Sequence, residues 1–239
     1  MKRLVIALQF LTRLPMPRVT ATAEDFAASM RWFPAAGLVV GVIVAAGGWA
    51  GSRIDPWTGA LVALLLWVGV TGALHLDGLG DIADAAGAAH KDRARLLAVL
   101  ADPHAGSFAV ATIAMQVLAK LVLLHGLIAA NAFAPIALTA FAARIGPLFW
   151  SRWLPDLHAG LGSTFRGVVR PAHLLLWSAT LVAAALLSPS LLLAPPILIA
   201  WGIWIKSRIG GISGDGHGAG IEIGESALLA VALGWSHIG

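Results

Sequence analysis

Three aspartates lie close together in the stretch ALHLDGLGDIADAAGA, residues 73–88. Asp77, Asp81 and Asp84 are spaced i, i+4 and i+7, so at about 100° per residue they fall within roughly 60° of one another on a helix. Carboxylates this close repel each other unless a cation lies among them, and oxygen ligands suit a hard divalent ion such as Mg²⁺. The spacing therefore predicts an acidic helical face that binds Mg²⁺. A solvated helix end that happens to be acidic is the alternative.

A second acidic group follows much later, in GDGHGAGIEIGE, residues 214–225. Glu222 and Glu225 are spaced i, i+3, and Asp215 precedes them in a glycine-rich loop whose backbone N–H groups could bind a phosphate. A flexible connector followed by a solvated helix start is the alternative. If the two acidic groups meet, they could form a two-metal site or a metal site with a neighbouring base.

Cations and one further acid complete the candidate phosphate-binding residues. Lys120 and Arg144 lie within apolar stretches, where each costs about 2.5–3.5 kcal/mol to insert, so they should face the interior of a helix bundle. There they either pair with the aspartates or bind substrate phosphate. Arg166 and Asp102, both in polar loops, are further candidates, although a general excess of positive charge on one membrane face would also explain the arginine.

These residue types favour the transfer of a phosphorylated group, with Mg²⁺ neutralising a diphosphate and cations offsetting the charge that develops. The chain has no GxxxxGK[ST] motif, which removes support for ATP hydrolysis of that kind. Its histidines near the acidic groups, including His75 and His217, are more often packed or solvated than catalytic in such positions. The absence of cysteine excludes disulfides, thiolate catalysis and cysteine-ligated zinc.

The elements that position these residues must lie in a membrane. The 239 residues are 59% hydrophobic and 12% charged, with a mean hydropathy of +0.85, whereas soluble domains have about 25% charged residues. We expect one all-α transmembrane catalytic domain over residues 1–239, a polytopic helix bundle with an interfacial or re-entrant arm at 1–34. The six to seven predicted helices cover about 35–51, 58–76, 107–130, 133–150, 172–188, 191–205 and 226–238.

The charges predict the orientation of this bundle. With the N-terminus in the cytoplasm, 13 of the 16 Lys and Arg residues fall on the cytoplasmic side, as does every acid except Asp55. Cytoplasmic loops are enriched in Lys and Arg. We therefore expect a multi-pass protein of the bacterial cytoplasmic (inner) membrane, with its active site facing the cytoplasm.

Five motifs of the chain resemble those of the cobalamin synthase family, in the same order and spacing. They are LTRLP (11–15), WFPAAGLVVG (32–41), HLDGLGDIADA (75–85), ADPHAGSFA (101–109) and GDGHGAGIEIGE (214–225). The resemblance covers nearly the whole chain, and HLDGLGDIADA is its most specific element. It implies an Mg²⁺-dependent integral membrane enzyme that acts late in cobalamin biosynthesis. Such an enzyme joins adenosylcobinamide-GDP to α-ribazole or α-ribazole 5′-phosphate and releases GMP.

The resemblance also implies roles for single residues. The acidic motif of the family matches Asp77, Asp81 and Asp84, and its later motif matches Asp215, Gly218 and Glu222. We therefore expect the four aspartates to be catalytic and to bind the metal. Substrate and phosphate would be bound by Asp102, Lys120, Arg144, Arg166, Gly218, Glu222 and Glu225. His217 departs from the family pattern and has no role that the resemblance supports. Membrane lipid and further copies of the chain are expected partners, and nucleic acid is not.

Two other functions are compatible with parts of the pattern. A CDP-alcohol phosphotransferase that makes phospholipid also uses aspartates at a membrane edge, but Gly80-Asp81 occupies the place of its Ala-Arg pair. An ion-coupled transporter could use buried acids and Lys120. A transporter would, however, tend to have internal repeats and more charges at mid-span than at one membrane face, and the sequence has neither feature.

Overall fold

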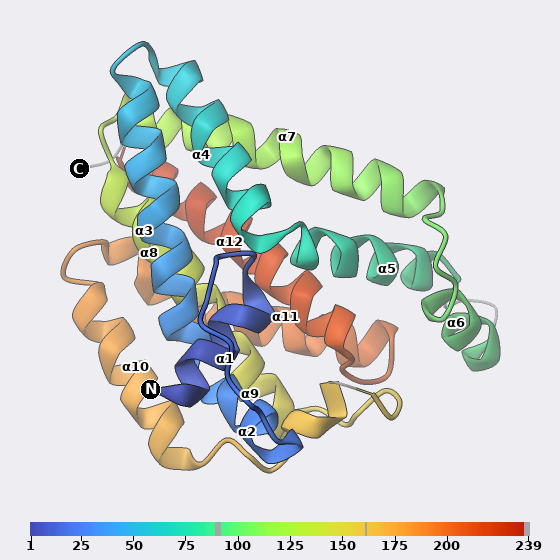
Figure 1. Cartoon of the computed structure of the whole chain (residues 1–239). Helices are drawn as coiled ribbons and strands as arrows, with labels where there is room; N and C mark the ends of the chain where they lie inside the picture. Colours follow the sequence, from blue (N-terminus) through green and yellow to red (C-terminus); the bar gives the residue numbers. More distant parts are fainter. Residues whose placement is uncertain (89–91, 161, 237–239) are drawn as a thin grey trace.

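The computed structural model describes residues 1–88, 92–160 and 162–236, which fold as a bundle of helices (Figure 1). Within those ranges the β-type pairing is limited to an isolated bridge between Asp156 and Ile212. The α-helices are α1 (Lys2–Leu11), α2 (Ala23–Ser29), α3 (Phe33–Ser52), α4 (Pro56–Thr71), α5 (Leu74–Ala88), α6 (Arg93–Leu100), α7 (Ser107–Ala129), α8 (Phe133–Ala143), α9 (Gly146–Trp153), α10 (Pro171–Ala184), α11 (Ala194–Arg208) and α12 (Gly214–Ser236). Three short 3₁₀-helices are η1 (Met30–Trp32), η2 (Gly162–Phe165) and η3 (Pro189–Leu193). The predicted all-α class is confirmed.

Several of these helices are long and apolar enough to cross a membrane. Among the described residues they are Ala23–Ser52, Ser107–Ala129, Phe133–Trp153 and Pro189–Arg208, and α4 with α5 makes a fifth if the pair is one bent span. Helix α10 is shorter, and α12 carries three acids in its first half. The polytopic membrane class is therefore confirmed, while the number of spans and the side of the N-terminus stay predictions.

The helix predicted at 58–76 is divided by a sharp bend. Helix α4 ends at Thr71, and α5 leaves at 82° to it. Gly72 and Ala73 between them both adopt left-handed backbone, with φ of 62° and 58°, and two such residues in succession end a right-handed helix. Hydrophobicity continues through the bend, so the sequence pattern did not reveal it. The bend turns the acidic motif away from the axis of α4.

The glycine-rich segment predicted as a loop up to Glu225 is helical from Gly214 onward. The resulting α12 passes through the middle of the bundle, in contact with α5, α7, α8 and α11 (Figure 1). Its first half, GDGHGAGIEIGE, is almost entirely buried. Small residues there let neighbouring helices approach closely, as in other membrane bundles. The last residues of the predicted 226–238 helix, 237 and 238, lie outside the described ranges.

Close packing of small residues also joins α3 to α8. A Cβ at Gly37 or Gly41 would collide with the backbone of α8 at Ala140 or Ala137, so the four-residue spacing of the glycines provides a flat contact face. The predicted arm at 1–34 forms α1, α2 and η1 and packs against α3 (Figure 1). Its aromatic rings form one wall of the cavity described next.

Candidate active site

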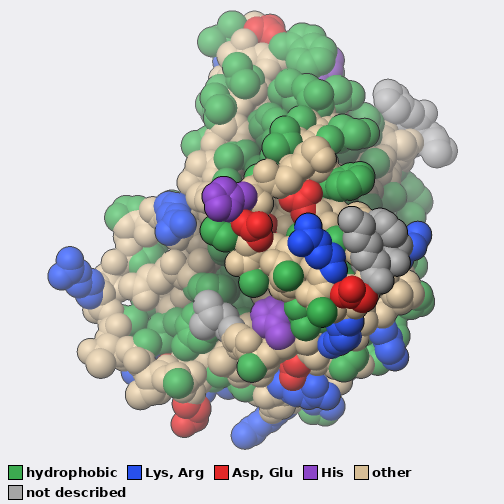
Figure 2. All heavy atoms as spheres, turned by 90° about the vertical axis from the view of Figure 1, so that its right-hand side faces the viewer, with side chains coloured by type: hydrophobic (Ala, Val, Ile, Leu, Met, Phe, Trp, Pro, Cys, Tyr) green, Lys and Arg blue, Asp and Glu red, His purple; other side chains and the backbone are tan. Residues whose placement is uncertain are grey.

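A cavity of about 280 Å³ lies where the starts of α5 and α12 meet the N-terminal arm. One part of its lining is apolar and comprises Phe10, Leu11, Phe33, Leu74, Phe165 and Ile221. Its polar lining comprises His75, Asp77, His158, Ser213, Asp215 and His217, and its glycines are Gly162, Gly214 and Gly218. In the face drawn in Figure 2, acidic, basic and histidine side chains gather across the middle and lower part, below a largely hydrophobic upper part. The cavity thus joins an aromatic wall to two of the predicted aspartates.

The two acidic motifs meet where α5 crosses α12. A Cβ at Gly78 would lie 2.9 Å from the carbonyl oxygen and 3.0 Å from the Cα of Asp215, so the backbones touch there. Asp77 is the residue before Gly78, so this contact brings it close to Asp215, and both side chains line the same cavity. Gly218, one turn further along α12, passes close to His75. The crossing therefore brings together motifs that lie far apart in the sequence.

The aspartates at this crossing lie close enough for their negative charges to repel one another. The carboxylates of Asp77, Asp84 and Asp215 all lie near enough to repel that of Asp81. Asp215 lies in the first turn of α12, outside the candidate spans. Its burial raises the pKa of its carboxyl, and the charge of Asp77 adds to the rise, although hydrogen bonds and His158 oppose it. Unrelieved repulsion of this kind favours binding of a cation.

Asp84 differs from the other aspartates because its carboxylate is already engaged. Its two oxygens accept hydrogen bonds from the backbone N–H groups of Gly106, at 2.6 Å, and Ala109, at 3.0 Å. These are donors at the start of α7, which an acceptor side chain stabilises as an N-cap does. Asp84 therefore fixes α7 to α5, and its predicted part in catalysis and metal binding stays a prediction.

The donors present suit the predicted Mg²⁺, although they are not gathered around one point. Asp77 and Asp81 accept no hydrogen bond and form no ion pair with the rest of the described chain, so their oxygens are available to a hard cation. Within the same ranges, no three acidic or histidine side chains are close enough to hold a metal between them. Binding of Mg²⁺ by Asp77, Asp81 and Asp215 would thus also require water or substrate oxygens, which Mg²⁺ ordinarily retains in its coordination shell.

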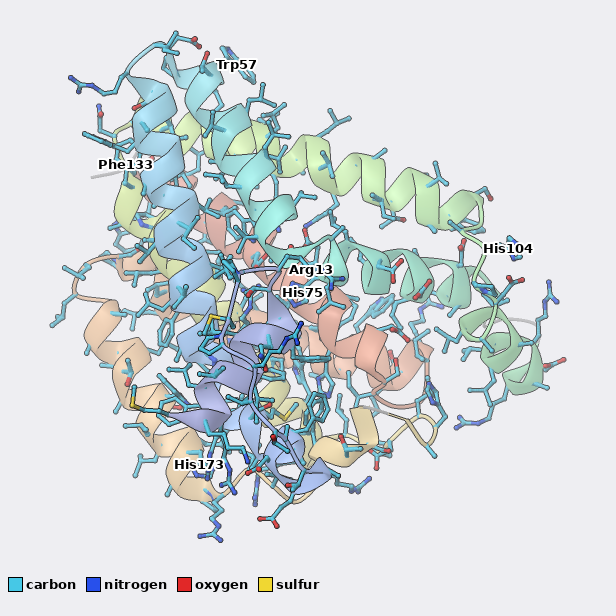
Figure 3. The ribbon with its side chains drawn as sticks, in the orientation of Figure 1. Arg13, Trp57, His75, His104, Phe133 and His173 are labelled. Carbon is cyan, nitrogen blue, oxygen red and sulfur yellow. The ribbon has the colours of Figure 1, made fainter. Side chains whose placement is uncertain are left out.

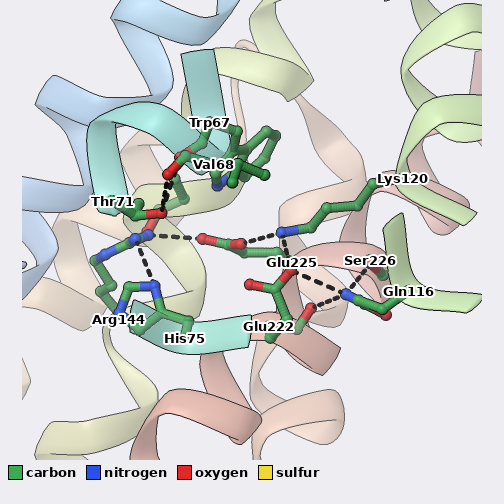
Figure 4. A network of polar contacts seen from close by, with 11 residues as sticks. Trp67, Val68, Thr71, His75, Gln116, Lys120, Arg144, Glu222, Glu225 and Ser226 are labelled. Carbon is green, nitrogen blue, oxygen red and sulfur yellow. Dashed lines mark hydrogen bonds and ion pairs between the residues drawn. The ribbon is translucent and has the colours of Figure 1, made fainter. Parts of the chain in front are cut away.

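Four residues predicted to bind substrate pair with one another in the core (Figure 4). Lys120 Nζ lies 2.6 Å from carboxylate oxygens of both Glu222 and Glu225, and Arg144 Nη1 lies 2.7 Å from the other oxygen of Glu225. All four side chains are at most 4% exposed. Two cations are thus balanced by two carboxylates, which is how buried charge is tolerated. Pairing with the aspartates was one of the two predicted roles of these cations, and in the structure their partners are Glu222 and Glu225.

Neighbouring side chains complete this network. Gln116 Nε2 donates to the backbone oxygen of Glu222 and to Ser226 Oγ, at 2.9 and 2.7 Å. The Lys120 ammonium also lies 4.4 Å from the centroid of the Trp67 ring, a cation–π contact. Phosphate binding by Lys120 or Arg144 would require these partners to be exchanged, and it stays a prediction.

The other predicted substrate-binding residues lie apart from the cavity or at its edge. Asp102 is exposed in the turn before α7, where its carboxylate accepts a hydrogen bond from the backbone of His104 and lies 2.7 Å from the imidazole. These hydrogen bonds lower the pKa of Asp102. Arg166 is also exposed and pairs with Asp156 at 3.0 Å. Gly218, by contrast, lines the cavity.

Arg13 is a candidate that sequence reasoning missed. Its backbone N–H donates to the carbonyl of Val70 at 2.7 Å, and its side chain lies over Gly72, where any Cβ would collide with it. Figure 3 shows it with His75 at the bend between α4 and α5. The side chain is exposed and, across the described ranges, has no acidic partner. Its position in the LTRLP motif is the sequence feature that could have identified it as a candidate.

Comparisons with known proteins identify the family of the chain. A model of the cobalamin-5-phosphate synthase family matches residues 3–233. The chain is 57% identical to an adenosylcobinamide-GDP ribazoletransferase of Novosphingobium aromaticivorans, with 99% of both chains covered. It is 44% identical to the enzyme of the same name from Thiobacillus denitrificans, covering 97% of this chain and 95% of the relative. It is 35% identical to the Pseudomonas aeruginosa enzyme of that name, covering 98% of each.

The chain belongs to the cobalamin-5-phosphate synthase family. The family predicted from the five motifs is therefore confirmed, and with it the assignment of the chain as a transferase of cobalamin synthesis. No solved structure matches the chain. In this member of the cobalamin-5-phosphate synthase family, the two most acidic motifs are the ones that cross at Gly78.

Proposed function

We propose that the chain is an Mg²⁺-dependent adenosylcobinamide-GDP ribazoletransferase, which transfers the phosphocobinamide group to α-ribazole or α-ribazole 5′-phosphate. The observation that carries the proposal is the crossing at Gly78, which puts Asp77 and Asp215 on one cavity. The names of the full-length relatives supply the substrates. Acidic side chains without cation partners are what a diphosphate–Mg²⁺ complex requires, since the metal supplies the positive charge.

The reaction is a substitution at phosphorus. A ribazole hydroxyl attacks the phosphorus attached to the cobinamide arm, a new P–O bond forms, and the bond from that phosphorus to the bridging oxygen breaks. GMP leaves with the bridging oxygen, and the hydroxyl proton passes to solvent or to a nearby base. Bound Mg²⁺ would neutralise the diphosphate and stabilise the departing phosphate.

The residues of the chain prepare this reaction by position and charge. Asp77, Asp81 and Asp215 would hold the metal from two helices, so the diphosphate would lie across the α5–α12 crossing. Arg13, exposed at the bend between α4 and α5, would contact a phosphate oxygen, because a guanidinium can donate two parallel hydrogen bonds. The buried Lys120–Glu222–Glu225–Arg144 network would act from behind the cavity, by fixing the helices that carry the aspartates.

We place the enzyme in the bacterial inner membrane, with several passes and with the acidic crossing facing the cytoplasm. The support is the excess of Lys and Arg on that side of the predicted topology, together with the apolar helices. The substrates are water-soluble and charged, so a site at the cytoplasmic surface would receive them directly. Lipid would surround the exposed apolar faces of α3, α7 and α11.

The proposal is tested by product analysis with the purified chain in lipid nanodiscs. Adenosylcobinamide-GDP is incubated with either acceptor, with Mg²⁺ or with a chelator, and GMP and the corrinoid product are separated by chromatography. We expect equal amounts of GMP and joined product, formed with Mg²⁺ and lost with chelator. Hydrolysis to GMP without joined product, or no reaction with either acceptor, would contradict the proposed activity.

A further inference from the structure

The cavity holds two buried histidines that the proposed chemistry does not use. His75 is 2% exposed and His217 is 6% exposed, and both line the cavity. Nε2 of His75 and both ring nitrogens of His217 have no hydrogen-bond partner in the described part of the chain. A buried polar group without a partner costs about 1–3 kcal/mol. Two such groups around one cavity indicate that a ligand supplies the missing partners.

The hydrogen bond of His75 determines which of its ring nitrogens can donate to a ligand. Its Nδ1 lies 3.4 Å from Nη2 of Arg144 (Figure 4). A guanidinium can only donate, so this nitrogen is the acceptor and the ring proton of a neutral imidazole lies on Nε2. His75 therefore presents an N–H donor that has no acceptor among the residues described. A neutral His217 has one donor and one acceptor nitrogen to offer beside it.

The rest of the cavity favours a flat, apolar ligand. Phe10, Phe33 and Phe165 form a cluster with ring centroids 5.6–6.3 Å apart, and all three line the cavity. The His217 ring stacks on Trp150, with centroids 6.0 Å apart and planes at 24°. A cavity of about 150 Å³ holds a single benzene ring, so 280 Å³ suits a two-ring aromatic system. A corrinoid is far too large for it.

We infer that this cavity binds the benzimidazole base of the acceptor, with the free ring nitrogen of that base hydrogen-bonded to His75 or His217. The inference rests on the proposed function for the identity of the acceptor. Within α-ribazole, the dimethylbenzimidazole has one ring nitrogen bonded to ribose, one free ring nitrogen and an otherwise apolar surface, which matches a mostly apolar lining with a few donors. Guanine carries donors and acceptors around both rings, and much of that polar edge would lose its partners here.

This placement determines where the reacting groups of the two substrates lie. With the base in the cavity, the attached ribose lies at the side where Asp77 and Asp215 line the wall. Its hydroxyl then faces the diphosphate held at the α5–α12 crossing. The corrinoid and the guanosine remain outside the cavity, on the exposed side of the aspartates.

The test measures the binding of each substrate separately, and His217→Phe is the central variant. Phenylalanine keeps the ring stacked on Trp150 but removes both nitrogens. A matched control is His125→Phe, because His125 also stacks on a tryptophan, Trp57, with centroids 3.8 Å apart, but lies away from the cavity. A second variant, Gly218→Ala, adds one methyl group that would lie 3.5 Å from the Cα of His75, an ordinary contact, and it narrows the cavity.

Equilibrium dialysis of the nanodisc protein with α-ribazole, with free dimethylbenzimidazole and with GMP gives the three affinities. We expect His217→Phe to weaken the binding of both benzimidazole compounds about 10-fold and to leave the affinity for GMP unchanged. The control His125→Phe should bind all three compounds as tightly as the wild type does. Gly218→Ala should weaken the same two ligands. Unchanged benzimidazole affinity in both cavity variants, or weakened GMP binding instead, would overturn the inference.

The outcome is separable from that of the proposed function. If the wild-type protein makes no joined product but binds dimethylbenzimidazole in a His217-dependent way, the activity is refuted and the cavity assignment stands. If it makes the product and the cavity variants bind α-ribazole normally, the activity stands and the cavity assignment is refuted.

Discussion

Replacing Gly78 with alanine should separate the two acidic motifs. The added Cβ would lie 2.9 Å from the carbonyl oxygen of Asp215 and 3.0 Å from its Cα, roughly half an ångström short of ordinary contact. Both atoms belong to the backbone of α12, so relief requires the helices to move apart. Overpacking of this kind costs about 1–3 kcal/mol. A misplacement of 1 Å in a reacting site can cost about 100-fold in rate, so we expect activity to fall about 10-fold or more.

The assay is GMP release over a range of Mg²⁺ concentrations, together with thermal unfolding in nanodiscs. Gly78→Ala should require more Mg²⁺ for half-maximal activity, because Asp77 and Asp215 would lie farther from each other than in the wild type. Gly69→Ala is the matched control: Gly69 lies on α4, and, apart from the nearby backbone of that helix, its Cβ would have no atom of the described residues within 4 Å. That change should leave activity intact and gain about 0.5–1 kcal/mol of helix stability. Wild-type activity and Mg²⁺ dependence in Gly78→Ala would refute the reasoning.

Three further changes probe the network, the charge cluster and the bend. Lys120→Met leaves buried carboxylates unpaired and should cost about 3–5 kcal/mol of stability, whereas the exposed Lys206→Met should not; equal unfolding temperatures would contradict the network. Asp81→Asn removes a repelled charge, so it should raise the unfolding temperature in chelator and reduce the stabilisation by Mg²⁺; a lower temperature in chelator would argue against that repulsion. Arg13→Gln should raise the KM for adenosylcobinamide-GDP about 10-fold with little change in unfolding, and an unchanged KM would exclude the phosphate contact.

The sequence revealed those features that depend on local periodicity. The i, i+4, i+7 spacing placed Asp77, Asp81 and Asp84 on one face of a helix, and they lie on α5. Composition and apolar length were enough for the all-α membrane class. Both are properties of neighbouring residues along the chain, which a single sequence contains.

Contacts between distant segments were not available in the same way. Nothing near Gly78 indicates that Asp215 touches it, and nothing near Lys120 indicates that its partners are Glu222 and Glu225. The first half of α12 resembles a loop because glycine disfavours helices, yet burial against four helices overrides that preference. The bend at Gly72 likewise depends on left-handed backbone that hydrophobicity does not report.

The central claim is that Asp77 and Asp215, from two different motifs, act together on the diphosphate. It is tested most directly by GMP release from adenosylcobinamide-GDP and α-ribazole, measured for Asp77→Asn, Asp215→Asn and the control Asp55→Asn. Asp55 caps α4 through the N–H groups of Trp57 and Thr58, a role that asparagine also fills. We predict a loss of about 100-fold or more in both site variants, with the control unchanged. Near-normal GMP release by either site variant would contradict the account.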